Sequence, residues 1–226
     1  MSAFPRVDAT SPAPPHRLAP PAARLQVIPH DDAARPQVEA FIQRVFAQRF
    51  EARVAHFAPV LVSLRDPLDG RIVAAAGYRA ADDAPLFLER YLGAPVEQRL
   101  SAMSGAPVQR SSVVEVGHLA AEQAGEGRRL IALLGQHLAA GGAQWVVSTL
   151  TESLRHLFLR LGITPLVLGA ADPARLGDDA LAWGRYYEHQ PIVLAGQLPQ
   201  ALQRLARRAA RPPHATDTTP HHGAAS

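Results

Sequence analysis

Two carboxylates stand where a globular protein normally buries apolar side chains. Glu115 interrupts the run Val-Val-Glu-Val that begins at Val113, and Glu89 lies in Leu-Phe-Leu-Glu-Arg. Because burial of an unpaired carboxylate costs several kcal/mol, each needs a partner or a raised pKa. A buried glutamate with a raised pKa suits a general base, and the two together could hold one cationic amine. The open alternative for Glu115 is a structural ion pair with Arg79 or Arg90.

A glycine-rich, basic turn follows the run that contains Glu115. Residues 123–129 read Gln-Ala-Gly-Glu-Gly-Arg-Arg, and apolar residues then recur at helical spacing up to Leu138. The start of a helix has free N–H groups and a partial positive charge, so such a turn can hold a diphosphate. The pattern is neither the dinucleotide fingerprint G-x-G-x-x-G nor a P-loop, which needs a lysine after its last glycine. The alternative interpretation is that residues 123–129 form only a tight turn and bind no diphosphate.

The composition excludes several chemistries. The chain has no cysteine, and all 23 basic residues are arginine, which excludes thiolate catalysis, cysteine zinc sites and lysine Schiff bases. The formal net charge is only +3 and the arginines form no dense patch with aromatics, so we expect no nucleic-acid partner. We expect no metal either, since His214, His221 and His222 read as a solvated tail. With neither a signal peptide nor a membrane-spanning run, we expect a cytoplasmic protein, and peripheral contact with the inner membrane stays open.

Periodicity predicts one ordered domain at 24–211, between a Pro/Ala-rich leader at 1–23 and a tail at 212–226. Val38, Phe41, Ile42, Val45 and Phe46 have helical spacing, and a turn at residues 66–70 joins two strands into a hairpin. Further strands and helices alternate down to a last basic helix at 198–209. This order predicts the α/β fold class, with helices on both faces of a central sheet.

Several segments carry a resemblance to known proteins. The turn Gln-x-Gly-x-Gly-Arg resembles the acyl-CoA-binding motif of the GNAT superfamily of N-acyltransferases. The blocks at 86–92 (Leu-Phe-Leu-Glu-Arg-Tyr-Leu), 115–120 (Glu-Val-Gly-His-Leu-Ala) and 183–187 (Trp-Gly-Arg-Tyr-Tyr) resemble the thermostable hemolysin family of bacterial proteins. The likeness runs from about Arg44 to Gly196. The family's domain resembles GNAT enzymes, especially acyl-homoserine lactone synthases, which implies a mixed, mostly antiparallel sheet.

The resemblance implies an acyl-CoA-dependent N-acyltransferase with coenzyme A as cosubstrate. The implied roles are catalysis by Glu115, Glu89 and His118; pantetheine contact by Leu119, Ala120 and Ala121; diphosphate binding by Gln123, Gly125, Glu126, Gly127, Arg128 and Arg129; and substrate binding by Arg79, Arg90, Tyr186 and Tyr187. His118 stands where the family is expected to carry Asn, so a hydrogen-bonded strand histidine is its alternative reading.

Two further expectations follow from the resemblance. Many GNAT enzymes carry a tyrosine as acid to the leaving thiolate where this chain has Phe158, so the acid would be Tyr186, Tyr187 or solvent. The apolar stretch at 86–103 could line the binding site of a long acyl chain, which favours a medium- or long-chain donor. The donor would be carried on CoA or on an acyl carrier protein.

The acceptor would be a small amine, an amino acid or a polyamine, and the protein a monomer or homodimer. Two other functions stay open. One is a membrane-active cytolysin whose last helix lies on an anionic bilayer. The other is a non-catalytic GNAT domain that senses acyl-CoA.

Overall fold

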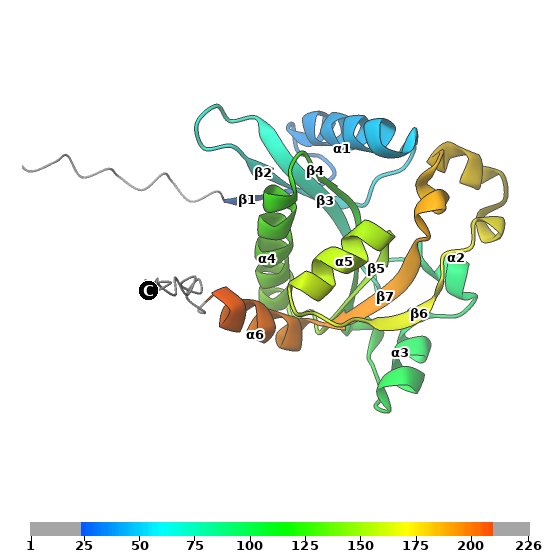
Figure 1. The fold of residues 1–226 in the computed structure, drawn as a ribbon. Helices are drawn as coiled ribbons and strands as arrows, with labels where there is room; N and C mark the ends of the chain where they lie inside the picture. The colour runs from blue at the N-terminus through cyan, green and yellow to red at the C-terminus, as the bar shows by residue number, and fades with distance from the viewer. Residues whose placement is uncertain (1–23, 210–226) are drawn as a thin grey trace, which may run out of the picture.

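A computed structural model describes residues 24–209 of the chain (Figure 1). The leader predicted at 1–23 and the tail predicted at 212–226, with its three histidines, lie outside the described residues.

The centre of the molecule is a seven-stranded sheet in the order β1-β2-β3-β4-β5-β7-β6. Neighbouring strands are antiparallel except β4 and β5, which are parallel. The strands are β1 Leu25–Ile28, β2 Val60–Arg65, β3 Ile72–Ala80, β4 Val113–Ala121, β5 Trp145–Leu150, β6 Leu166–Ala170 and β7 Ile192–Gln197. The predicted mixed, mostly antiparallel sheet is therefore confirmed.

Helices cover both faces of this sheet (Figure 1). One face carries α1 Arg35–Phe50, α2 Glu89–Leu92 and α3 Val96–Ser104, together with the short turns η1 Arg110–Ser112, η2 Pro173–Trp183 and η3 Tyr186–His189. The other face carries α4 Ala124–Ala140, α5 Glu152–Arg160 and α6 Leu198–Ala209. Because side chains alternate along a strand, Val114 and Val116 of β4 pack with α4, whereas Val113 packs with α2 and α3.

Helix α1 forms where the apolar spacing predicted it. Its five periodic residues, Val38, Phe41, Ile42, Val45 and Phe46, are all buried against β2 and β3. Pro36 suits the first turn, since its missing N–H has no intrahelical partner there. The helix ends at Phe50, and its C-terminal residues reach the middle of the sheet.

The segment from α2 to α3 contradicts one expectation. Leu86, Leu88, Leu92, Val96 and Leu100 are buried in a core cluster with β5 and β7 rather than lining an open surface. This part of the sheet is not covered by α1, so these side chains are needed to close it. The prediction that 86–103 walls an acyl chain is therefore wrong for most of the segment.

Helix α6 packs its apolar side on α4. A Cβ added at Gly135 of α4 would lie 3.3 Å from Leu202 and 3.6 Å from Leu198 of α6. The apolar face that a bilayer-bound helix would insert is thus partly covered by protein: Leu198 is buried, and Leu202 and Leu205 are half-buried. Among the described residues, no helix is long and apolar enough to cross a membrane.

Candidate functional site

Strands β4 and β5 separate in the middle of the sheet. Their only paired positions are Val113 with Trp145, Val114 with Val146, and Glu115 with Val147. Beyond them β4 runs on to Ala121 beside β3 alone, and β5 runs on beside β7 alone. The edge of β4 that faces β5 therefore presents main-chain groups with no strand partner, starting just past Glu115.

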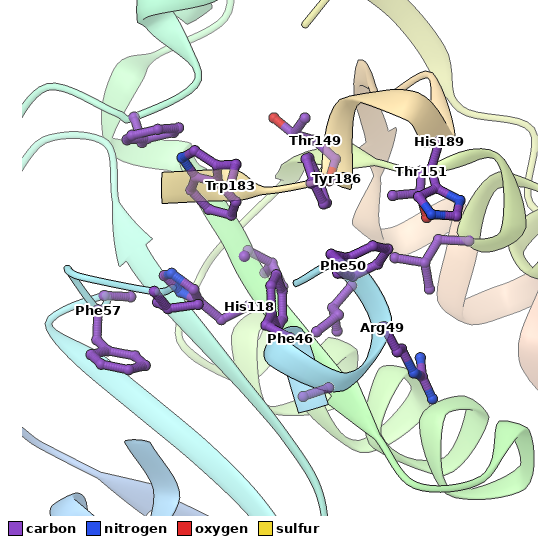
Figure 2. Close-up of a pocket in the computed structure, with 18 of the residues that line it drawn as sticks. Phe46, Arg49, Phe50, Phe57, His118, Thr149, Thr151, Trp183, Tyr186 and His189 are labelled. Carbon is purple, nitrogen blue, oxygen red and sulfur yellow. The ribbon is translucent and has the colours of Figure 1, made fainter. Parts of the chain in front are cut away.

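A cavity of about 660 Å³ occupies this split. On one face of the sheet it is lined by α4 and α5, through residues such as Ile131 and Leu154. On the other face it is lined by α1, α2 and the η2–η3 segment, through Phe46, Tyr91 and Trp183. Figure 2 shows the aromatic side, where Phe46, Trp183 and Tyr186 surround the opening. Two reactants could thus meet in the split from opposite faces of the sheet.

Glu115 lies at the closed end of the split and lines the cavity. Its Oε2 accepts the N–H of Phe87 at 2.8 Å, and its Oε1 accepts the N–H of Leu88 at 3.1 Å. Burial raises the pKa of Glu115, although these two N–H groups and the charge of Arg79 act in the opposite direction. Neither Arg79 nor Arg90 forms an ion pair with it within the described chain, so the proposed structural pair is absent. Each oxygen keeps a lone pair for a further donor.

Glu89 does not join Glu115 in the cavity. Its carboxylate accepts hydrogen bonds from the N–H groups of Leu86 and Val96, both at 2.8 Å. Arg110 binds the same carboxylate at 2.6 and 3.0 Å. Burial raises the pKa of Glu89, but the bonds from Arg110 and the two N–H groups outweigh it, and the net pKa is lowered. Glu89 therefore holds α2 and α3 in place, and the expectation that two carboxylates share one amine is corrected.

His118 occupies a bulge in β4. The register with β3 shifts between Ala75 and Gly77, and His118 has φ 54°, in the left-handed region. Its ring lies between Phe46 and Phe57, with centroid distances of 6.3 and 5.6 Å (Figure 2). Burial lowers the pKa of His118 to about 4, with the main chain of His56 opposing, so the ring is neutral at pH 7. Its Nδ1 is buried without a hydrogen-bond partner among residues 24–209.

The four predicted substrate-binding residues divide between the cavity and the core. Arg79, Arg90 and Tyr186 line the cavity, whereas Tyr187 does not. Arg79 donates to the carbonyl of Pro85 at 3.1 Å, and Arg90 pairs with Asp179 at 2.9 Å. The Tyr186 hydroxyl donates to the carbonyl of Thr149 at 3.2 Å, and that of Tyr187 bonds to Tyr91 at 2.7 Å. Burial raises the pKa of both Tyr186 and Tyr187, so neither is disposed to ionise.

The predicted cofactor residues meet the cavity at its α4 end. Leu119, Ala120, Ala121, Gln123 and Gly127 line it, and the lining does not include Gly125, Glu126, Arg128 and Arg129. The two glycines fall inside the first turn of α4, which begins at Ala124, rather than before it. Glu126 lies 3.7 Å from Arg129, its i+3 neighbour. The start of α4 thus reaches the cavity through Gln123 and Gly127, whereas Arg128 and Arg129 are exposed beside it.

Sequence reasoning missed several lining residues. Arg49 lines the cavity and donates to the carbonyl of Ala121, beside the start of α4. Thr149, on β5 past the split, also lines the cavity, and its hydroxyl is buried with no partner among the described residues. Neither carries a local signal, because an arginine just beside the apolar stripe or a strand threonine is common on any surface.

A second, apolar chamber of about 80 Å³ lies between the sheet and α4, α5 and α6. It shares Val116, Leu119 and Ile131 with the main cavity, so the two adjoin across these side chains. Its lining is almost entirely aliphatic, with Ser148 as a polar exception, and includes Phe158 and Ala201. Across the described residues, no group of three or more potential metal ligands occurs.

Comparisons with known proteins agree with this architecture. Residues 28–202 match the family model described as Thermostable hemolysin. No curated protein matches the chain. Among solved structures, apo TofI superposes with a TM-score of 0.56 at 18% identity, covering 81% of this chain and 96% of TofI.

Two further structures share the fold at low identity. BjaI, a CoA-dependent acyl-homoserine lactone synthase solved with SAM and isopentyl-CoA, has a TM-score of 0.56 at 15% identity, covering 85% of this chain and 92% of BjaI. FeeM, an N-acyl amino acid synthase from uncultured soil microbes, has a TM-score of 0.53 at 12% identity, covering 80% of this chain and 98% of FeeM.

Proposed function

The chain belongs to the thermostable hemolysin family, and from this premise we propose that it is an N-acyltransferase. The reaction moves a medium- or long-chain acyl group from acyl-CoA, or from an acyl carrier protein, to the amino group of a small acceptor. The observation that carries the proposal is the split between β4 and β5 with the buried carboxylate of Glu115 at its closed end. BjaI and FeeM, which are named as acyl-transferring synthases, share this fold and support the same class of reaction.

The donor fits the α4 side of the split. The edge of β4 at Leu119, Ala120 and Ala121 has no strand partner on the β5 side and offers main-chain groups to the amides of pantetheine, as a missing strand would. The carbonyl of Ala121 already accepts a hydrogen bond from Arg49. The N–H groups at the start of α4 and the guanidinium groups of Arg128 and Arg129 then take the diphosphate. Gln123 and Gly127 line the same end of the cavity, and Glu126 is drawn towards Arg129.

The acyl chain would start in the main cavity of about 660 Å³ and point towards the apolar chamber rather than along the segment at 86–103. At about 80 Å³, the chamber takes only the last few carbons of the chain. A chain that enters past Val116, Leu119 and Ile131 reaches aliphatic surface between α4 and α6. Burial of each methylene there contributes about 0.8 kcal/mol, which favours longer chains.

Glu115 serves as the base. It accepts a proton from the acceptor ammonium, directly or through water, and the neutral amine attacks the thioester carbonyl carbon. A C–N bond forms, the C–S bond breaks, and the second proton of the nitrogen passes to solvent as the thiolate is protonated. The neutral ring of His118 lines the same cavity and could accept or donate a hydrogen bond without adding charge.

Release of free CoA thiol tests the proposal. With decanoyl-CoA and a panel of amines and amino acids, we expect thiol release only when a suitable acceptor is present. Glu115→Gln should keep CoA binding and lose turnover by about a hundredfold or more, the contribution of a general base. Failure of a broad acceptor panel to release thiol, with CoA bound tightly, would instead identify a non-catalytic acyl-CoA sensor.

The family name points to lysis, which this reaction explains indirectly. An acylated acceptor with a long chain is a surfactant, and its accumulation lyses cells without insertion of the protein. Purified protein should therefore leave liposomes intact until donor and acceptor are both added. Leakage caused by the protein alone would support the cytolysin alternative.

A further inference from the structure

Two opposite charges lie side by side on the acceptor side of the cavity. Arg79 of β3 and Glu115 of β4 are direct partners across the antiparallel strands, so their side chains project from the same face of the sheet. Both line the cavity. No ion pair joins them within the described chain, although Arg79 lies close enough to lower the pKa of Glu115.

Each of these charges is held by main-chain groups instead of by the other. Glu115 accepts the N–H groups of Phe87 and Leu88, and Arg79 donates to the carbonyl of Pro85. A guanidinium has five N–H donors, so Arg79 keeps most of its capacity for a carboxylate. The site therefore offers one anion and one cation that are separately positioned and not neutralised by each other.

The other charges on this side favour an acceptor that carries an anion. Arg90 is paired with Asp179, and Arg53, which is exposed, adds a further positive charge to the lining. A polyamine bound at Glu115 would extend its second ammonium towards these arginines. An amine that also bears a carboxylate would satisfy Glu115 and Arg79 at once.

The walls beside this charge pair are aromatic. Phe57, Phe87 and Trp183 line the cavity, and Phe87 and Trp183 lie 5.9 Å apart between ring centroids. Apart from Glu115 and the paired Asp179, the lining of the cavity contains no carboxylate that could bind a basic side chain. The remaining space suits an apolar substituent.

We propose that the acceptor is an α-amino acid with an apolar side chain, whose ammonium group binds at Glu115 and whose carboxylate binds at Arg79. The inference rests on the proposed N-acyltransferase function and names its substrate class. In the balanced reaction, the thioester R–CO–S–CoA and the amino acid give R–CO–NH–CHR′–COO⁻ and CoA thiol, with one proton released from the original ammonium. The product is an anionic N-acyl amino acid.

Matched pairs of acceptors test the inference. L-Leucine is compared with 3-methylbutylamine, and L-phenylalanine with 2-phenylethylamine, each with decanoyl-CoA as donor. Because a charge-assisted, bidentate contact is lost in the amines, we expect kcat/KM at least tenfold higher for each amino acid. Arg79→Met should reduce kcat/KM for the amino acids at least tenfold more than for the amines. Arg79→Lys should recover part of that difference, since it keeps the charge but not the fork.

Exposed Arg175 lies outside the cavity lining and provides the control, because Arg175→Gln should preserve the ratio between amino acid and amine. Turnover of the amines at rates equal to or above those of the amino acids would overturn the inference while leaving the N-acyltransferase function intact. An equal loss for both acceptors in Arg79→Met would also overturn it. Calorimetric titration of L-leucine into the protein with CoA adds a measure independent of turnover. Thiol release with no acceptor, together with no saturable leucine binding, would remove both proposals.

Discussion

Glu115 of β4 and Val147 of β5 are the last partners before the two strands separate. The carboxylate that interrupts the apolar strand β4 therefore lies at the point where the sheet opens. A glutamate one position earlier or later would project from the opposite face of the sheet, where Val114 and Val116 pack with α4. The cost of burying the charge is offset in part by the N–H groups of Phe87 and Leu88, which Glu115 in turn holds in place.

The state of His118 predicts a pH dependence of stability. Its pKa is lowered by burial to about 4 in the folded protein, against an ordinary value of 6.5. Between these values the unfolded chain binds a proton that the folded protein does not, so stability is lost as the pH falls from about 6.5 to 4. The difference amounts to about 3 kcal/mol.

Replacement by asparagine should remove that dependence. Asn tolerates the positive φ of this position better than most residues, and it is the residue expected there in the family. In chemical unfolding at several pH values, the free energy of unfolding of the wild type relative to His118→Asn should decrease towards acid pH. Parallel curves for the two proteins would show that His118 is not buried in the neutral form.

At Gly184, next to Trp183 of the cavity lining, we expect that no side chain larger than hydrogen is tolerated. Its φ is 51°, and a Cβ added there would lie 2.4 Å from the carbonyl oxygen of Phe50 and 2.6 Å from that of Glu51. Because Arg185 donates its N–H to Phe50, the η2–η3 segment cannot move away without loss of a bond. Gly184→Ala should lower the free energy of unfolding by about 2–4 kcal/mol.

Gly105 provides the matched control for this substitution. Its φ is 74°, and an added Cβ meets nothing within 4 Å, so Gly105→Ala carries only the backbone penalty of about 1 kcal/mol. Thermal unfolding should separate the two variants clearly. Equal melting temperatures would mean that Gly184 is not in close contact with α1.

The apolar chamber predicts chain-length selectivity. Ala201 of α6 lines it, and Ala201→Phe would fill part of its volume. Since each buried methylene contributes about 0.8 kcal/mol, every carbon that no longer fits should cost about fourfold in kcat/KM. With hexanoyl-, decanoyl- and tetradecanoyl-CoA as donors, the preference should move towards the short chain. An unchanged profile, in a variant with a normal melting curve, would place the chain elsewhere.

The arginines at the start of α4 should increase the affinity for donors that carry a diphosphate. The double substitution Arg128→Gln and Arg129→Gln should weaken binding of decanoyl-CoA about tenfold at low salt, and less as ionic strength rises. Decanoyl-pantetheine lacks the diphosphate, so its binding should change much less. Equal losses for both donors would show that these arginines act on the structure rather than on the phosphates.

Local patterns predicted the parts of the fold that are determined by neighbours in sequence. The spacing of Val38, Phe41 and Ile42 predicted α1, and the turn before Arg71 predicted the hairpin. The separation of β4 from β5 leaves no local pattern in the sequence, because it depends on which residues stop pairing across the sheet. The same limit applied to Glu89, whose partner Arg110 lies 21 residues away in the sequence.

Some residues of the candidate site have signals in the sequence, whereas others reach the site only through tertiary contacts. Glu115 and the turn at 123–129 carried visible signals, a charge in an apolar run and glycines before a helix. Arg35 carried none, yet its buried guanidinium donates to the carbonyls of Ala58 and Pro59 at 2.8 and 2.9 Å and fixes the loop that contains Phe57. Such contacts join elements whose proximity exists only in the folded chain.

A crystal structure of the protein with CoA and decanoate, or with a non-hydrolysable decanoyl-CoA analogue, tests the central claim most directly. We predict that pantetheine runs along β4 at residues 119–121, that the diphosphate lies at the start of α4, and that the thioester position faces Glu115 directly or across one water. A donor bound outside the β4–β5 split, or a thioester turned away from Glu115, would contradict the account.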